Sequence, residues 1–559
     1  MGINNAQSVR LSEHTAPSRS GVRPLILVLL VSLWITSICN VALWRELSRL
    51  PDLSTGQVIK LCVSLGLAVL FCTAALLSVF STRWILKPMV TVFLISAALG
   101  AYFMVTYGVV IDKTMMVNTL QTDLRETRDL LSWRLAAYVG VLAVAPSFWV
   151  WRQTVRWQNA WRQLLSNAVA TTGCLLLTVL VVMVSFQSIA SVMRNATHVR
   201  YLINPLNSFY ALGSLAAQPF QKGKKALVPI GEDAKLGSSY VSQKAPPLLL
   251  LVVGETARSG NFSLNGYTRP TNPKLAKETL VSQRNAWSCG TSTAASLPCM
   301  FSDLGRLGYD ARSSNFEGLL DVLQRAGLAV LWIDNQSGCK GACDRVASVS
   351  TTALATPVLC DGGECFDEIM LQGIDERIAA LPADRRAKGV VVVMHQMGSH
   401  GPAYFKRSPA AFKAFQPECT NNNLQSCSQA SLINAYDNSI VYTDHFLASS
   451  LSWLKTRQQN ATAMVYVSDH GESLGENNLY LHGMPYSVAP DVQKKVPWIT
   501  WLSDGFTKRS GITTNCLNQR LDTPISHDNY FHSVLGIMNI QTSVYKPSLD
   551  MYAACATAP

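Results

Sequence analysis

Residues that can bind a metal ion or move protons follow one apolar run near the end of the chain. The run AMVYVSD covers residues 463–469, and its end and the next residues supply Asp469, His470, Glu472, Glu476 and His482. An apolar run with β-branched residues predicts a buried strand. Open α/β sheets bind their ligands at the carboxyl ends of strands, so this cluster predicts a functional site.

Two other apolar runs end in the same kinds of residue. Glu255 follows the run at 248–254, and His395 and His400 end or follow the run at 389–395. Carboxylate oxygens and imidazole nitrogens are preferred ligands of zinc. A single Glu or His of this kind is usually solvated or satisfied in a core. Several of them on successive strand ends predict a metal site.

The segment WSCGTSTAASLPCM, residues 287–300, offers a nucleophile. A turn of small and hydroxyl residues before a predicted helix exposes N–H groups that suit a phosphoryl group. A hydroxyl beside zinc loses its proton more easily than in water. An ordinary Ser/Thr helix cap is the simpler explanation of this segment taken alone. The sequence pattern alone does not show whether Thr291, Ser292 or Thr293 is the nucleophile.

The elements that must position these residues are apolar runs alternating with amphipathic stretches. The runs are strand-sized and lie at 248–254, 328–334, 389–395, 463–469 and 496–502. Amphipathic stretches such as FEGLLDVLQRAG and INAYDNSIVYTDHFLASSLSWLK separate them. Strands that are apolar on both faces predict a mainly parallel sheet sandwiched by helices. We expect this soluble α/β domain to cover residues 246–559.

The first third of the chain predicts a membrane domain. The chain has 559 residues, of which 48% are apolar, and its mean hydropathy is positive. Runs long enough to cross a bilayer lie at 24–44, 58–80, 89–110, 135–151 and 166–190, which predicts five transmembrane helices within residues 1–190. The first run is too long for a cleaved signal peptide, and no small-residue cleavage site follows it.

Basic residues beside these runs predict the orientation of the chain. They are Arg10, Arg19, Arg23, Arg83, Lys87, Arg152, Arg156 and Arg162. Basic loops stay in the cytoplasm, so an odd number of spans places residues 191–559 outside it. The net charge of +12 suits a surface near anionic lipid but is weak evidence for any partner. A nucleic-acid partner is not expected.

Ten of the 14 cysteines fall after residue 285, and eight of them form close pairs. The pairs are Cys289 with Cys299, Cys339 with Cys343, Cys360 with Cys365, and Cys419 with Cys427. Such pairs indicate disulfides in an oxidising compartment and zinc ligands in the cytosol. The predicted orientation favours disulfides. Cys516 and Cys555 could form a fifth, but their separation leaves this open.

Two segments connect the predicted membrane and soluble parts. Residues 191–245 form a bridge, in which RYLINPLNSFYALGSLA suits a helix in the headgroup layer. The loop at 107–134 also has a helical pattern, lies on the outer side, and could contact the soluble domain.

Several motifs together resemble a known family. They are GETAR with NFSLNGY, SCGTSTAASLPCMFS, DNQSGCKG, HQMGSHGPAY, and SDHGESLGENN with YLHG. They resemble the phosphoethanolamine transferases that modify lipid A, which include colistin-resistance enzymes and belong to the alkaline phosphatase and sulfatase superfamily. The resemblance extends over nearly the whole chain, including the five-span portion.

The resemblance implies a role for each motif residue. It implies a Zn²⁺ held by Glu255, Asp469, His470 and the nucleophile Thr293, the second Thr of CGTSTA. It further implies that His400 and His482 bind a second metal ion or the phosphate and protonate departing oxygens. Substrate contacts are implied for Gln336, where many relatives have Asn, and for Lys340, Glu472 and Asn118.

The implied reaction has two steps. Thr293 takes phosphoethanolamine from phosphatidylethanolamine, and a lipid A phosphate then accepts it, which gives polymyxin resistance. The lipopolysaccharide core is the alternative acceptor. The implied location is the inner membrane of a Gram-negative bacterium, with a monomeric catalytic domain in the periplasm.

The same residues also allow other functional classes. A sulfatase lacks support because no C/S-x-P-x-R pattern follows Cys289 or Ser292. A lipoteichoic-type polymerase shares the spans and the Thr nucleophile, but the dense cysteines disfavour it. A non-catalytic membrane receptor would not need the full Glu, Thr, Asp and His set.

Overall fold

The computed structural model describes residues 21–50, 53–122, 124–222, 227–241, 243–351, 358–361 and 364–556. The chain divides into two compact units, described separately below. The first contains residues up to 40, 47–98 and 138–191; the second contains 41–46, 99–137 and everything from 192 onward. Arg10 and Arg19, which help to predict the orientation, lie outside the described residues.

Long apolar helices coincide with all five predicted membrane runs. Within the described ranges, four helices are long and apolar enough to cross a membrane. They are α3 (Thr55–Val79), α4 (Leu86–Tyr107), α9 (Ala160–Val184) and the helix Trp133–Arg152, which comprises α7 (Trp133–Val139), a π-helical stretch (Gly140–Val144) and α8 (Ala145–Arg152). The bent pair α1 (Pro24–Ile38) and α2 (Val41–Ser48) makes a fifth if it is one span. The Asn40 side chain donates to the Ile35 carbonyl at 2.9 Å, which caps the end of α1 at the break.

The second unit is built around an eight-stranded sheet. Its order is β15 (Ile525–Ser526), β4 (Val281–Trp287), β14 (Lys495–Leu502), β11 (Ala461–Ser468), β3 (Pro247–Gly254), β10 (Val390–His395), β6 (Ala329–Asp334) and β7 (Ala347–Ser350). All neighbours are parallel except at β14, which runs opposite to β4 and β11. The predicted mainly parallel sheet is confirmed, and each of the five predicted runs is a strand.

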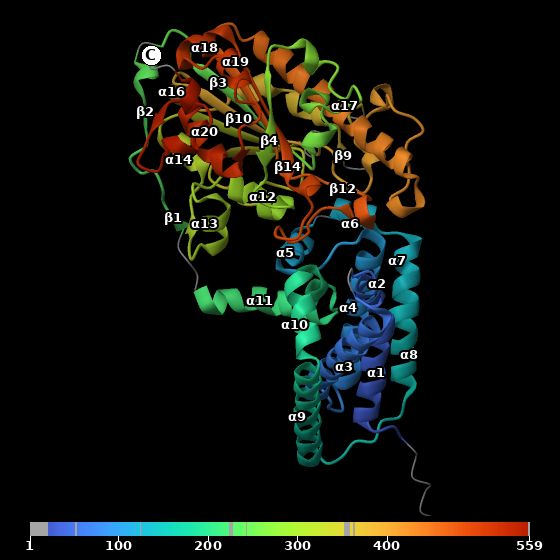
Figure 1. Ribbon diagram of the computed structural model, residues 1–559. Helices are drawn as coiled ribbons and strands as arrows, with labels where there is room; N and C mark the ends of the chain where they lie inside the picture. Colours follow the sequence, from blue (N-terminus) through green and yellow to red (C-terminus); the bar gives the residue numbers. More distant parts are fainter. Residues whose placement is uncertain are drawn as a thin grey trace, which may run out of the picture. The chain divides into compact units, whose positions relative to one another are not determined.

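Helices cover both faces of this sheet (Figure 1). Along β3, Leu249, Leu251 and Val253 point into one core, and Leu248, Leu250 and Val252 point into the other. The first core is completed by α12 (Thr293–Met300), α14 (Leu319–Arg325) and α20 (Tyr530–Ile537), and the second by α17 (Gln429–Lys455). Burial on both faces explains why the strands are continuously apolar.

The predicted helical loop at 107–134 contains two short helices, α5 (Lys113–Gln121) and α6 (Leu124–Leu130). Asp112 is the N-cap of α5, and its carboxylate accepts from Met115 N at 2.8 Å. In the second unit, α5 packs against α12. The bridge segment contains α10 (Phe186–Asn195), a 3₁₀ turn at Thr197–Leu202 and α11 (Leu206–Lys222).

The ten cysteines after residue 285 form five disulfides. The four pairs predicted from their spacing are present, and Cys516 with Cys555 is the fifth. The remaining four form none of these disulfides: Cys39 directly follows α1, Cys62 and Cys72 lie in α3, and Cys174 lies in α9.

Candidate active site

Two carboxylates, an imidazole and a hydroxyl meet at the carboxyl edge of the sheet. Glu255, Asp469, His470 and Thr293 are all buried there. Thr293 Oγ1 lies 3.0 Å from Glu255 Oε2 and 3.5 Å from His470 Nε2. One ligand atom from each of Glu255, Asp469 and His470 lies within 4.8 Å of the other two. The structure therefore brings together the four residues that the sequence motifs imply for a metal site.

The pairing of two parallel strands places the two carboxylates side by side. In the register of β3 with β11, Gly254 lies opposite Ser468, so Glu255 and Asp469 leave the sheet at the same level. Asp469 N donates to Gly254 O at 2.9 Å, which extends this pairing to the site. Gly398 packs against Glu255 with φ +51°, and a Cβ there would lie 2.6 Å from Glu255 O. Only glycine fits this position.

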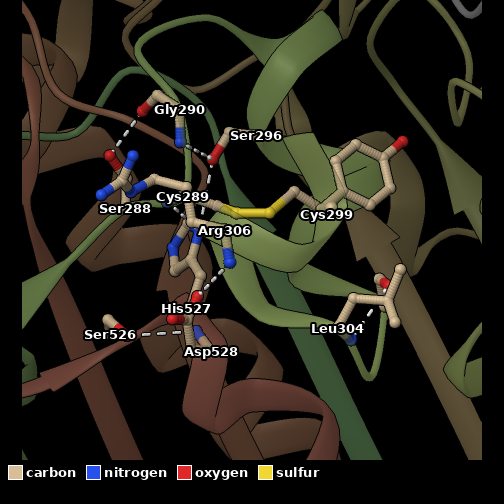
Figure 2. Close-up of a disulfide and its surroundings, with 12 residues drawn as sticks. Ser288, Cys289, Gly290, Ser296, Cys299, Leu304, Arg306, Ser526, His527 and Asp528 are labelled. Atoms are coloured by element: carbon tan, nitrogen blue, oxygen red, sulfur yellow. Dashed lines mark hydrogen bonds between the residues drawn. A yellow bond between two sulfur atoms is a disulfide. The ribbon is translucent and has the colours of Figure 1, made fainter. Parts of the chain in front are cut away.

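Thr293 is held at the start of α12 by a buried polar network. Its N-cap is Ser292, and the following turn places Ser296 Oγ where it donates to Asp469 O and accepts from Gly290 N at 3.3 Å. Cys289 N donates to His527 Nδ1 at 3.0 Å, and Figure 2 shows this histidine beside the Cys289–Cys299 disulfide. The network fixes the turn that presents Thr293 to Glu255.

His527 was missed by the sequence analysis. It follows β15, a strand of two residues that carries no apolar run, so no strand-end pattern marks it. Burial lowers the pKa of His527 to about 3, which keeps the ring neutral. Its Nε2 donates to Ser468 O at 3.0 Å, leaving Nδ1 as the acceptor for Cys289 N. This histidine therefore joins the Thr293 turn to the end of β11.

The charges in the site favour a bound cation. Burial and the negative charge of Glu255 raise the pKa of Asp469 to about 6. Burial alone would lower the pKa of His470, but Asp469 and Glu255 raise it to about 10. Asp469 Oδ2 is buried and has no hydrogen-bond partner among the described residues. His470 Nδ1 donates to Gly471 O at 2.8 Å, so Nε2 faces the carboxylates and offers its lone pair there when a cation replaces its proton. This donor set fits a divalent cation such as Zn²⁺.

A second pair of histidines lies beside this centre. The His482 ring centroid is 4.4 Å from that of His470 and 5.6 Å from that of His400. His482 Nδ1 lies 2.8 Å from Glu472 Oε2, and Tyr404 donates to the other oxygen of the same carboxylate. Glu472 therefore orients His482, whose Nε2 can exchange a proton.

The other predicted residues divide between those near the centre and those apart from it. Gln336 Nε2 donates to Glu255 Oε2 at 3.2 Å. Lys340 Nζ instead donates to Ser337 O at 3.1 Å, and Asn118 lies half-buried on α5. No contact found among the described residues joins Lys340 or Asn118 to Glu255 or Thr293.

Two residues of the strand-end clusters pair with residues outside the group of Glu255, Asp469 and His470. His395 Nδ1 faces Asp334 Oδ2 at 3.2 Å, and its ring packs on Trp332. Glu476 pairs with Arg258 at 2.7 Å. Their position after a strand thus reflects local ion pairing and packing.

The loop at 107–134 reaches the His400 segment through Arg407. The Arg407 side chain is 4% exposed, and its Nε donates to His400 O at 2.8 Å. Its two other nitrogens pair with Asp129 of α6 at 3.3 Å and with Glu364 at 2.9 Å. The predicted contact between this loop and the soluble domain is therefore present, and it supports His400.

A buried hydroxyl, two carboxylates and histidines at the strand ends of such a sheet define an enzyme of the sulfatase type. Residues 247–540 match the Sulfatase family model, and residues 69–220 match the model of phosphoethanolamine transferases EptA/EptB. The phosphoethanolamine transferase EptA of Escherichia coli K12 is 38% identical over 543 residues, covering 96% of this chain and 98% of that protein.

Two further comparisons agree. The phosphatidylethanolamine transferase Mcr-1 of Escherichia coli is 38% identical over 555 residues, covering 96% and 99% of the two chains. The solved integral membrane lipooligosaccharide phosphoethanolamine transferase A of Neisseria meningitidis superposes with a TM-score of 0.90 at 33% identity, covering 95% and 99%. The chain belongs to the EptA-type phosphoethanolamine transferase family and is an enzyme of that class.

The neutral, buried state of His527 predicts a specific pH dependence of stability. The folded-state pKa of about 3 lies below the unfolded value near 6.5, so the unfolded chain binds the extra proton as the pH falls between these values. Between pH 7 and pH 5 the wild type should lose about 2 kcal/mol of unfolding free energy that His527→Gln does not lose. Urea unfolding at both pH values measures the difference, and equal losses in both proteins would refute this role.

The buried cation of Arg407 predicts a contrast with its neighbour Lys406, which pairs with the same Asp129 but is 43% exposed. Arg407→Gln leaves Asp129 and Glu364 without their buried cation and should lower the unfolding free energy by about 3–5 kcal/mol. Lys406→Gln should cost less than about 1 kcal/mol. Chemical denaturation of both variants measures how much unfolding free energy each substitution removes. Similar losses for the two variants would contradict the role of Arg407 as the buried cation.

Proposed function

We propose that this enzyme transfers phosphoethanolamine from phosphatidylethanolamine to a phosphate of lipid A through Thr293. The observation that carries the proposal is the Thr293 hydroxyl, held 3.0 Å from Glu255 at the first residue of α12. The neighbouring hydroxyls are placed differently. Thr291 donates to Met484 O at 2.6 Å, and Ser292 is the helix N-cap. Thr293 is thus the hydroxyl that faces the carboxylates.

Glu255, Asp469 and His470 would hold a Zn²⁺ next to Thr293 Oγ1. When bound, the ion makes the hydroxyl easier to deprotonate and neutralises phosphoryl charge. His400 and His482 would either contact the phosphoryl oxygens or hold a second Zn²⁺, and zinc analysis of the His482→Ala enzyme separates these roles.

In the first step, Thr293 Oγ1 attacks the phosphorus of phosphatidylethanolamine. Its proton passes to water, and the bond from phosphorus to the diacylglycerol oxygen breaks. His482, oriented by Glu472, supplies the proton that the departing diacylglycerol takes up. The N–H groups at the start of α12 stabilise the negative charge on the phosphoryl group.

In the second step, a lipid A phosphate hydroxyl attacks the phosphorus of the phosphoethanolamine-threonine and gives its proton to His482. The bond from phosphorus to Thr293 Oγ1 breaks, and Thr293 takes a proton back from water. Gln336, Lys340, Asn118 and Glu472 would hold the phosphoethanolamine. The Glu472 carboxylate suits its ammonium group, and the lysine suits its phosphate.

The proposed setting follows from the lipid substrates. We propose a five-span membrane domain at residues 1–190, a bridge at 191–245 with a helix in the headgroup layer, and a periplasmic catalytic domain at 246–559. The enzyme would act as a monomer in the inner membrane of a Gram-negative bacterium. Capping lipid A phosphates lowers their negative charge, which accounts for resistance to cationic polymyxins.

The Thr293→Ala variant tests the proposal. It should lower transfer by about 10³-fold or more while zinc content and melting temperature stay near wild type, because the nucleophile alone is removed. The matched control, Thr291→Ala, should retain most of the activity. Mass spectrometry of lipid A from cells expressing each protein measures transfer.

The covalent intermediate provides the decisive readout. Wild-type enzyme incubated with phosphatidylethanolamine and no acceptor should carry phosphoethanolamine on residue 293 in the peptide between Cys289 and Cys299. An adduct on Thr291 or Ser292, or full activity of Thr293→Ala, would overturn the assignment. Modification of the lipopolysaccharide core instead of lipid A would keep the mechanism and change the acceptor.

A further inference from the structure

A cavity of about 310 Å³ lies within the first unit, and none of the candidate active-site residues is among those that line it. It is formed where α1 begins, α3 ends and α9 begins. The residues that matter for its chemistry are Arg23, Ser78, Arg156, Gln163 and Asn167, with Leu25 and Trp157 as apolar walls. We call it the Arg23–Arg156 cavity.

Backbone pairing brings the two arginines together. Val22 N donates to Thr154 O at 2.9 Å, and Arg156 N donates to Val22 O at 3.0 Å, so the segments before α1 and α9 run side by side. Both arginines are exposed, and no Asp or Glu is among the described residues that line the cavity. By contrast, the cavity around Arg407 contains Asp129 and Glu364. The Arg23–Arg156 cavity therefore has uncompensated positive charge.

The inner end of the cavity is polar and buried between helices. Gln163 Nε2 donates to Asn167 Oδ1 at 2.8 Å, and Asn167 Nδ2 donates to Ser81 O at 2.8 Å. Ser78 is 1% exposed, and its hydroxyl has no hydrogen-bond partner among the described residues. A buried hydroxyl without a partner is unfavourable, so a ligand oxygen that accepts from Ser78 would complete this lining.

The position and charge of the cavity select one class of ligand. Helices long enough to cross a bilayer place their ends at the level of lipid headgroups, where basic pockets between helices bind anionic headgroups. A phosphate diester offers acceptor oxygens to both guanidinium groups and to Ser78. The ammonium of phosphatidylethanolamine would meet no carboxylate on the described lining. We propose that the Arg23–Arg156 cavity binds a phospholipid of net negative charge, of the phosphatidylglycerol class, distinct from the donor lipid.

The test uses the delipidated full-length protein in detergent, titrated with phosphatidylglycerol, phosphatidylethanolamine or inorganic phosphate and followed by native mass spectrometry. The variant Arg23→Gln/Arg156→Gln removes both cations. Because both arginine side chains are exposed, the two substitutions should leave folding unchanged. The matched control Arg83→Gln/Arg162→Gln removes two exposed arginines that do not line the cavity.

We expect phosphatidylglycerol to bind the Arg23→Gln/Arg156→Gln variant about 30-fold more weakly than wild type, and the control variant with nearly wild-type affinity. Phosphatidylethanolamine and inorganic phosphate should bind wild type and both variants alike. Unchanged phosphatidylglycerol affinity in the first variant, an equal loss in the control, or the same loss for phosphatidylethanolamine or inorganic phosphate would overturn the proposal.

Discussion

The parallel register of β3 with β11 is the constraint on which the site depends. It brings Glu255 and Asp469 out of the sheet side by side, in a place where both are buried. Two buried carboxylates repel each other, so they need a nearby positive charge. His470 lies within reach of both and supplies it when protonated, and a divalent cation can replace that proton. The site is thus preorganised for a cation before any substrate binds.

The remaining contacts fix what surrounds the carboxylate pair. The Thr293 turn is tied to β11 through Ser296, which bonds Asp469 O, and through His527, which bonds Ser468 O. On the other side, Arg407 supports the His400 backbone with a buried ion pair that includes Asp129 of α6. A change in the loop at 107–134 can therefore reach the histidines beside the centre. Such supports hold a hydroxyl and its bases at reacting distance.

The sequence was sufficient for the features that depend on local pattern. Continuous apolar runs predicted the strands, and their carboxyl ends predicted that Glu255, Asp469 and His470 meet. The runs could not show that β14 is antiparallel, because strand direction depends on distant connections. Strand β4 was not predicted because Gln283, Arg284 and Asn285 interrupt its apolar pattern. His527 and the Arg407–Asp129 pair were invisible because they join residues far apart in the chain. Thr293 was chosen by resemblance alone, and the structure adds the contact with Glu255.

Anomalous diffraction at the zinc edge, from crystals of the full-length enzyme purified without chelator, tests the central claim most directly. The account predicts a peak within ordinary zinc bonding distance of Glu255, Asp469, His470 and Thr293 Oγ1. The peak should vanish in Asp469→Asn/Glu255→Gln, which removes the negative charge of both carboxylates. A wild-type crystal with zinc bound elsewhere and none between these carboxylates would contradict the account.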